Sequence, residues 1–197
     1  MPGPSLIGLT GGVAAGKSEA LRILDELGAE TVSTDALVHE LLGTAEVRGL
    51  LVERWGERVA PGGRIDRAKV GEVVFADSDE LEWLEGVLHP RVGERVIDWR
   101  RSLPDDLGVG VVEVPLLFEG RMAELFDATI CVTAEDELRR DRAEDRGTDQ
   151  LGGREGRQLS QAEKAERATF VVENDGSVED LGMRLERLLP KLEAAGA

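Results

Sequence analysis

The sequence predicts an α/β fold in which a parallel sheet is covered by helices on both faces. Apolar runs of strand length alternate with runs of helical spacing, which is typical of βαβ units. A glycine-rich loop separates the first strand run from the first helical run, where such folds bind phosphate. Five strands are expected, over residues 6–10, 30–33, 109–114, 128–133 and 170–173.

The loop after the first strand run follows the spacing G-x-x-x-x-G-K-S, from Gly11 to Ser18. Glycines let backbone N–H groups surround phosphates, lysine adds a charge for the outer phosphates, and serine supplies a magnesium ligand. An ordinary glycine-rich turn is the alternative, but the flanking strand and helix patterns argue against it. We therefore expect a P-loop NTPase-type core. Its ATP contacts would be Gly12, Val13, Ala14, Ala15, Gly16, Lys17, Ser18 and Glu19, with the metal at Ser18.

Residues 36–103 interrupt the alternation of strands and helices. Their apolar residues recur mostly at helical spacing, and all three tryptophans of the chain lie among them. We interpret the tryptophans as the core of a helical insertion, because they stand among aliphatic residues; a stacking platform is the alternative. The core domain would then comprise 1–35 and 104–197, and its last helix, 177–195, would be interrupted or kinked near Pro190.

A polar, arginine-dense segment covers about 139–157 and contains almost no apolar residues. Such composition predicts a mobile lid. Phosphoryl transfer spreads negative charge over the moving group, and arginines on a closing segment can meet that charge. Ion pairing with the many acids of the chain is the alternative for any single arginine. The candidates are Arg142, Arg146, Arg154 and Arg157.

Acidic residues follow two of the expected strands. Asp35 comes just after the second strand run, and the carboxyl ends of parallel strands gather at the edge where ligands bind. Asp35 could accept a hydroxyl proton, hold a magnesium-bound water, or cap the next helix. Glu113 ends the third run, where P-loop enzymes often place a second magnesium-associated carboxylate. Glu119 also admits a role as a solvated or helix-capping charge.

The two histidines and the only asparagine leave structural and functional interpretations open. His89 precedes Pro90, a position that favours extended backbone, so we expect a turn between helices there. His39 lies on the helix after Asp35, where a solvated position is the alternative, and neither histidine has metal-pair spacing. Asn174 follows the last strand, where adenine could rest or a plain turn could form. The chain lacks the Asn-Lys-x-Asp motif of a GTPase.

The bulk composition argues against several function classes. The formal net charge of −16 would repel nucleic acid and anionic membranes. Cys131 is the only cysteine, which excludes an intramolecular disulfide and a cysteine zinc site. We see no signal peptide and no apolar run of membrane-spanning length. We expect a cytoplasmic protein that is a monomer or a weak homo-oligomer.

Together these motifs resemble the dephospho-CoA kinase family over nearly the whole chain. The P-loop is shared by many families. More particular to this one are the pair His89-Pro90, the run 115–119, and a late polar set made up of Gln158, Lys164 and Asn174. The resemblance rests on the phosphate loop, Asp35, the runs 63–67, 74–75, 81–85 and 114–119, His89-Pro90, Gln158, Lys164, Ala168, and the run 172–177.

The resemblance implies transfer of the ATP γ-phosphoryl group to the ribose 3′-hydroxyl of dephospho-CoA, with Mg²⁺. It implies a five-stranded parallel core, an acceptor-binding insertion at 36–103 and a short lid. Asp35 would orient and deprotonate the hydroxyl, while Lys17, Arg142 and Arg146 would act on the phosphates. Asn174 would border adenine. The acceptor would be contacted by Thr10, Asp35, His39, His89, Pro115 and Leu116.

Several positions depart from the family pattern. Ser33-Thr34-Asp35 stands where Asp-Ala-Asp is usual, and His39 stands where an arginine is usual. Ala14 replaces a common glycine, Glu19 a common serine or threonine, and Thr169 a common aspartate. The charge of Glu19 close to the anion site could weaken nucleotide binding.

Two other functions stay open from the sequence. One is another small P-loop kinase, acting on a nucleoside monophosphate or a small alcohol; His89-Pro90 and the run 115–119 argue against it. The other is a non-catalytic nucleotide-binding relative of a kinase. Retention of Lys17, Ser18 and Asp35 argues against that second interpretation.

Overall fold

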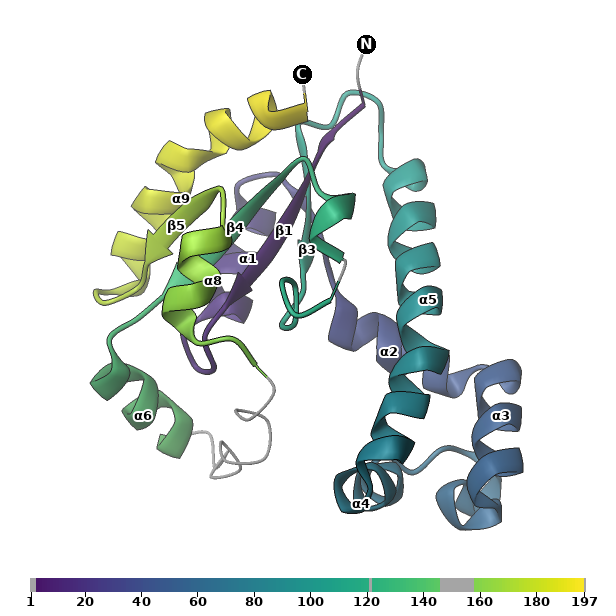
Figure 1. Ribbon diagram of the computed structural model, residues 1–197. Coiled ribbons are helices and arrows are strands. Elements are labelled where there is room, and N and C mark those ends of the chain that lie inside the picture. The colour runs from purple at the N-terminus through teal and green to yellow at the C-terminus, as the bar shows by residue number, and fades with distance from the viewer. Residues whose placement is uncertain (1–2, 121, 146–157, 197) are drawn as a thin grey trace. The chain divides into compact units, whose positions relative to one another are not determined.

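The structure, a computed structural model, describes residues 3–120, 122–145 and 158–196 (Figure 1). The chain forms two compact units. The first, which we call the sheet unit, comprises Met1–Ser33 and Trp99–Ala197; the second, the helical unit, comprises Thr34–Asp98. The helical unit is thus inserted into the sheet unit, and the chain passes between them twice.

The sheet unit contains the five parallel strands that the apolar runs predicted. They are β1 (Ser5–Gly11), β2 (Glu30–Ser33), β3 (Val109–Glu113), β4 (Ala128–Thr133) and β5 (Phe170–Glu173). Their order is β2-β3-β1-β4-β5, and every neighbouring pair is parallel. All seven residues of β1 are buried, because this strand has a partner on each side and helices over both faces.

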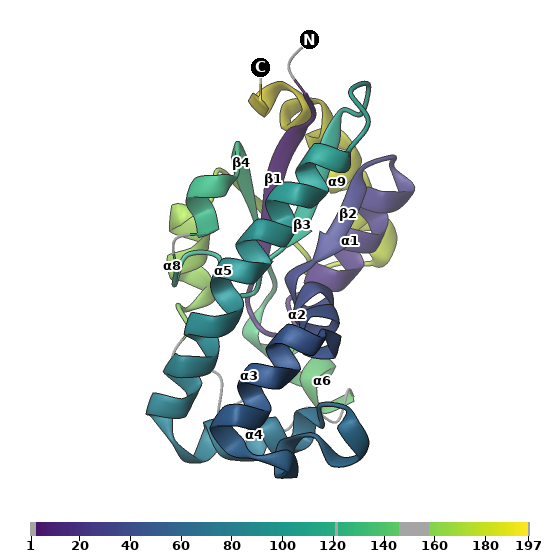
Figure 2. The same cartoon turned by 90° about the vertical axis from the view of Figure 1, so that its right-hand side faces the viewer.

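Helices cover the two faces of this sheet, as the fold class predicted. On one face, α1 (Lys17–Glu26) and α9 (Val178–Glu193) pack against each other and against the strands. On the other face, α8 (Gln161–Arg167) packs against β1 and β4. Figure 2 shows α8 and the α1–α9 pair on opposite sides of the strands. The core between the sheet, α1 and α9 includes Ile7, Leu9, Leu24, Ile130, Val132, Leu181, Leu185 and Leu192.

The helix α9 continues through a proline that was expected to interrupt or kink it. Ser177 and Asp180 form a capping box that starts it. It then continues to Glu193 through Pro190, so the predicted interruption is wrong. Pro190 removes one N–H from the last turn, but Leu185 and Leu192 are fully buried on either side of it. This packing keeps the segment helical.

The helical unit contains α2 (Thr34–Gly43), α3 (Ala45–Trp55), α4 (Arg67–Ala76) and most of α5 (Ser78–Ser102), with short 3₁₀ turns at Glu57–Val59 and Pro61–Gly63. Trp55 is buried and meets Trp83 edge to face, with ring centroids 5.2 Å apart. Trp55 is thus a core residue, as predicted, whereas Trp83 is only partly buried and carries the Arg54 guanidinium over its ring. Trp99 belongs to the sheet unit, where its ring lies beside Gly110.

The long helix α5 contains both His89 and Pro90, so the predicted turn between helices is wrong. Pro90 lacks an N–H and cannot bond to the carbonyl of Gly86. The helix continues because Leu84, Leu88, Val92 and Val96, four residues apart, are buried along one face. Neither α5 nor any other helix in the described ranges has the length and apolar character needed to cross a membrane.

Candidate active site

The phosphate loop joins the end of β1 to the start of α1. Gly16 is the N-cap of α1 in left-handed conformation, with φ 98°, and as a glycine it makes no side-chain capping bond. The first N–H groups of a helix lack intrahelical partners, so this uncapped end offers donors to an anion. Ala14 also has a positive φ of 58°, a conformation that costs a non-glycine residue about 1 kcal/mol. Ala14, which replaces a glycine common in the family pattern, therefore stands at a position where glycine would adopt the backbone conformation without strain.

The carbonyl groups of the loop are held by side chains. Lys17 Nζ donates to the carbonyls of Gly12 (2.9 Å) and Gly11 (3.3 Å). Arg139 Nε donates to the Val13 carbonyl at 2.9 Å, and Asn174 Nδ2 donates to the Ala15 carbonyl at 2.9 Å. Within the loop, the Ala15 N–H donates to the Gly12 carbonyl at 3.2 Å. Because the loop carbonyls are held by side chains, its other N–H groups can serve a ligand.

The carboxyl end of β3 lies beside the loop's own strand. Glu113 is paired in register with Leu9 of β1 and Ser33 of β2, and it is buried. The hydroxyl of Thr10 is also buried and lies 3.4 Å from the Pro115 carbonyl, to which it donates. Contact between Thr10 and a substrate stays a prediction. Pro115 and Leu116 are each partly exposed and stay candidates for the same role.

Lys164 of α8 is fully buried and forms an ion pair inside the sheet unit. Its Nζ lies 3.0 Å from Glu119 Oε1 and donates to the Pro115 carbonyl at 2.6 Å. Glu119 also accepts from the backbone N–H groups of Leu159 and Phe118. Glu119 is therefore neither a solvated nor a helix-capping charge, because it ties the segment after β3 to the start of α8.

Arg142 lies on α6 (Asp136–Asp145) and points toward the end of β5. Its Nη2 donates to the Asn174 carbonyl at 3.1 Å, while its Nη1 is buried and has no hydrogen-bond partner among the described residues. The other predicted lid arginines, Arg146, Arg154 and Arg157, lie outside the described residues. A role of Arg142 in phosphoryl transfer stays a prediction.

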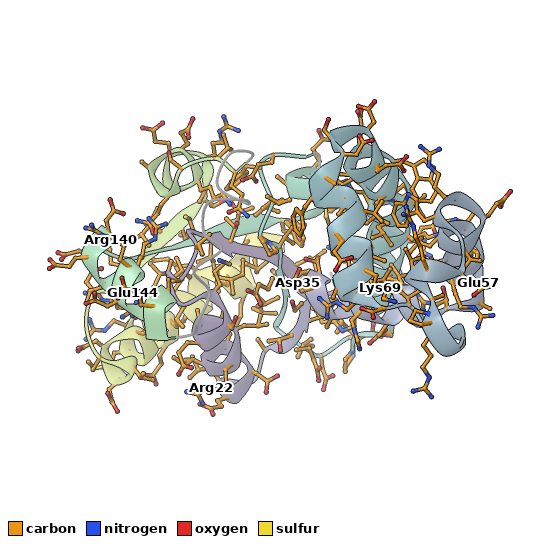
Figure 3. The ribbon with its side chains drawn as sticks, turned by 90° about the horizontal axis from the view of Figure 1, so that it is seen from below. Arg22, Asp35, Glu57, Lys69, Arg140 and Glu144 are labelled. Atoms are coloured by element: carbon orange, nitrogen blue, oxygen red, sulfur yellow. The ribbon has the colours of Figure 1, made fainter. Side chains whose placement is uncertain are left out.

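Asp35 lies two residues after β2 ends, in the first turn of α2. The helix begins at Thr34, so Asp35 is inside the helix and is not its cap. Figure 3 labels Asp35. His39 follows one turn later on the same face, and both side chains are exposed. His89 is exposed on α5. Their contacts with an acceptor stay predictions.

The helical unit also has an open pocket of about 600 Å³ that the sequence did not predict. Its lining includes Arg54, Trp55, Lys69 and Glu80. Arg54 bonds to Glu80 through both Nε and Nη2, and the Trp55 indole N–H donates to the same carboxylate. These bonds hold the pKa of Glu80 below its ordinary value, and the bond from Arg54 has the largest effect. The opposite charges of Arg54 and Glu80 therefore compensate each other within the pocket lining.

Several polar side chains that hold the phosphate loop or the segments after β3 and β4 could not be assigned these contacts from the sequence. Arg139 is 126 positions from Val13, and no local pattern distinguishes it from the other arginines of its segment. Gln161 holds Ala134 by two hydrogen bonds, through its side-chain oxygen and its side-chain nitrogen. Lys164 had one signal, its place in the late polar set, but nothing in that set indicated burial. Only the tertiary fold brings these side chains to the loop and to the segments that follow β3 and β4.

A family model described as dephospho-CoA kinase matches residues 5–180 of the chain. The chain belongs to the dephospho-CoA kinase family. The match spans the phosphate loop, the whole helical unit and all five strands. Membership in this family therefore rests on both units of the structure.

Proteins named dephospho-CoA kinase align with the chain over nearly its full length. One from Streptomyces avermitilis is 38% identical over 186 residues, which are 91% of this chain and 89% of the relative. One from Thermobifida fusca is 33% identical over 192 residues, which are 95% of this chain and 96% of the relative. The resemblance inferred from the motifs is thus confirmed.

Solved structures share the fold. TT1252 from Thermus thermophilus has a TM-score of 0.82 and 33% identity, covering 96% of this chain and 98% of that one. The dephospho-CoA kinase of Campylobacter jejuni has a TM-score of 0.68 at 24% identity, with 96% and 97% covered. A shikimate kinase from Acinetobacter baumannii has a TM-score of 0.52 at 17% identity, with 96% and 95% covered. These last two likenesses concern the fold alone, and they confirm the P-loop kinase architecture.

Proposed function

We propose that the protein transfers the γ-phosphoryl group of ATP to the ribose 3′-hydroxyl of dephospho-CoA, giving coenzyme A and ADP. The observation that carries the proposal is the family match over residues 5–180. The uncapped start of α1 and the occupied carbonyls of the phosphate loop support it, because both leave N–H donors for phosphate oxygens.

Lys17 is the proposed cation for the outer phosphates. Its ammonium group lies against the Gly11 and Gly12 carbonyls, so it is already at the loop that would hold ATP. A phosphate oxygen offers a stronger, charge-assisted bond than a neutral carbonyl. Lys17 would exchange carbonyl oxygens for phosphate oxygens when ATP binds, and it would stabilise the charge that develops on the transferring group.

Asp35 is the proposed general base. Its exposed carboxylate comes just after β2 in the chain. The neighbouring strand β3 ends in Glu113 at the same carboxyl edge of the sheet, because Glu113 is paired with Ser33 of β2. The acceptor oxygen would attack the γ-phosphorus, the bond from that phosphorus to the β,γ-bridging oxygen would break, and Asp35 would take the hydroxyl proton. The electron pair of the broken bond would leave on ADP.

Mg²⁺ is part of the proposal. The Ser18 hydroxyl is exposed at the start of α1 and makes no hydrogen bond with a described residue, so it fits a ligand to a metal that accompanies ATP. The ion would neutralise charge on the phosphates. The lid arginines, the acceptor contacts, a cytoplasmic location and a monomeric or weakly oligomeric state remain predictions.

The experiment that tests the substrate is an ADP-release assay with ATP and a panel of acceptors. We expect turnover with dephospho-CoA and a product that carries a 3′-phosphate. Turnover with AMP or shikimate but none with dephospho-CoA would assign a different small-molecule kinase. ATP binding without turnover on any acceptor would instead support a non-catalytic relative.

The experiment that tests the base compares Asp35→Ala with Glu40→Ala. Glu40 is an exposed acid on the same helix, and no role is proposed for it. Loss of the base should lower kcat at least about a hundredfold while ATP still binds, and Glu40→Ala should behave like the unaltered protein. Equal kcat values in the two variants would exclude Asp35 as the base.

A further inference from the structure

We propose that Arg139 and Asn174 are positioning residues that orient two peptide groups of the phosphate loop. The inference rests on the proposed function only in taking this loop as the site of the ATP phosphates. In a planar trans peptide, the C=O of one residue and the N–H of the next point in opposite directions. A side chain that holds a loop carbonyl therefore turns the following N–H to the other side of that peptide.

Arg139 acts on the peptide between Val13 and Ala14. Its Nε donates to the Val13 carbonyl at 2.9 Å, and Asp136 holds its Nη1 at 2.9 Å. A Cβ built on Gly12 would come within 3.1 Å of the guanidinium carbon, so the group lies directly against the loop. Ala14, which follows this peptide, has φ 58°. Arg139 thus stabilises a peptide orientation that the alanine itself disfavours.

Asn174 acts on the peptide between Ala15 and Gly16. Its side chain is buried, and its Nδ2 donates to the Ala15 carbonyl at 2.9 Å. Its backbone N–H donates to the Thr133 carbonyl at 2.7 Å, which fixes the residue to the end of β4. A Cβ built on Gly16 would overlap Asn174 Nδ2, so the two residues are in tight contact. Asn174 therefore orients the N–H of Gly16, the N-cap of α1.

The two positioning residues are also joined to each other. Arg142 lies one turn after Arg139 on α6, and its Nη2 donates to the Asn174 carbonyl at 3.1 Å. The phosphate loop, α6 and the end of β5 are consequently linked by side-chain hydrogen bonds. This arrangement assigns Asn174 to the loop backbone, in place of the contact with adenine that its sequence position suggested.

The test measures the affinity for ATP with Mg²⁺, by calorimetry and without any acceptor. Arg139→Met and Asn174→Asp each remove the donor, and each should lower the affinity about tenfold. Arg140→Met is the matched control: Arg140 is exposed on the same helix (Figure 3), and among the described residues its Nε bonds only to the Asp136 carbonyl. It should stay within about twofold of the unaltered protein.

A second readout separates positioning from a simple loss of charge. In the nucleotide-free protein, amide NMR resonances should move for Ala14 in Arg139→Met and for Gly16 in Asn174→Asp. Arg140→Met should move neither. A fall in affinity with an unmoved Ala14 resonance would mean that Arg139 acts by charge alone, and it would overturn the proposal for that residue.

Folding is checked by circular dichroism before each titration. If Asn174→Asp does not fold, Asn174→Ala lacks both the donor and the added charge and carries the same expectation. Unchanged ATP affinity in folded Arg139→Met and folded Asn174 variants would refute the proposal. Because no acceptor is present, this outcome is independent of whether dephospho-CoA is the substrate.

Discussion

At the scale of single residues, the sheet unit depends on polar groups that are buried and fully engaged. Lys164 is the largest example, with no exposed surface and two oxygen partners, Glu119 and the Pro115 carbonyl. Buried charges are tolerated in proteins when they are paired and hydrogen-bonded, as here. Removing one member leaves the other without compensation, and the cost then exceeds what the pair contributes in stability.

Lys164→Met should therefore destabilise the protein strongly. It would leave the Glu119 carboxylate without its cation, and we expect a loss of about 3–5 kcal/mol in the free energy of unfolding. Urea denaturation measures this. Lys191→Met, at an exposed position on α9, is the control and should change the stability by less than about 0.5 kcal/mol. Similar urea midpoints for the two variants would contradict the assigned role of the pair.

Cys131 should be inert in the folded protein. It is fully buried in β4, and burial raises the pKa of its thiol to about 11. The thiolate is the reactive form, so a disulfide reagent at about pH 8 should label the native chain only as fast as β4 becomes exposed. Unfolded protein should react at once with one equivalent. Rapid labelling of the native protein would show that this strand is accessible.

At the scale of elements, the sequence patterns predicted whether a segment is a strand or a helix better than they predicted where a helix is interrupted. All five strands lie within one residue of the predicted bounds. The three central strands β1, β3 and β4 are almost wholly buried, and such parallel strands are near-continuous apolar runs. Pro90 and Pro190 misled the argument, since buried residues on either side of each proline keep α5 and α9 helical. Proline's local preference is visible in a sequence, whereas the packing that overrides it is not.

The capping box of α9 gives an element-scale prediction. Ser177 Oγ accepts from the Asp180 N–H at 3.1 Å, and Asp180 Oδ2 accepts from the Ser177 N–H at 3.0 Å. Ser177→Ala removes the cap and should lower the free energy of unfolding by about 1 kcal/mol, measured by chemical denaturation. Ser78→Ala, at the exposed start of α5 where no described bond uses the hydroxyl, is the comparison. An equal effect of the two changes would refute the importance of the cap.

The same cap should respond to acid. Hydrogen bonds from the Ser177 backbone, and then from its hydroxyl, hold the pKa of Asp180 below its ordinary value in the folded protein. The unfolded chain therefore binds the proton more readily, so this contribution to stability is complete above the unfolded pKa and is lost as pH falls through the folded pKa. The difference in the free energy of unfolding between the unaltered protein and Ser177→Ala should become smaller below about pH 4. If this difference in the free energy of unfolding stays constant down to strong acid, protonation of Asp180 does not weaken the cap.

At the scale of the whole molecule, charge is the dominant feature. The chain carries 40 acidic and 24 basic residues, a formal net charge of −16. Mutual repulsion of like charges destabilises a folded protein, and dissolved salt screens it. The melting temperature should therefore rise by several degrees between low salt and about 1 M KCl. Sucrose, which does not screen charge, is the control, and a melting temperature that KCl leaves unchanged would contradict this expectation.

The candidate site was predictable only in part. Local spacing identified the phosphate loop, since Gly11 to Ser18 are contiguous and their chemistry is particular to phosphate. Arg139 and Asn174 contact the same loop from 126 and 159 positions away in the chain. Contacts of that range depend on how β4, α6 and β5 are arranged, which no local pattern encodes.

The central position of β1 also has a consequence for biosynthesis. This strand is made first, yet its two hydrogen-bonding neighbours, β3 and β4, begin only at Val109 and Ala128. Thr34–Asp98, in contrast, form one uninterrupted stretch with its own buried residues. During translation the helical unit therefore leaves the ribosome complete, while the apolar β1 segment must wait for more than a hundred further residues before its edges are paired.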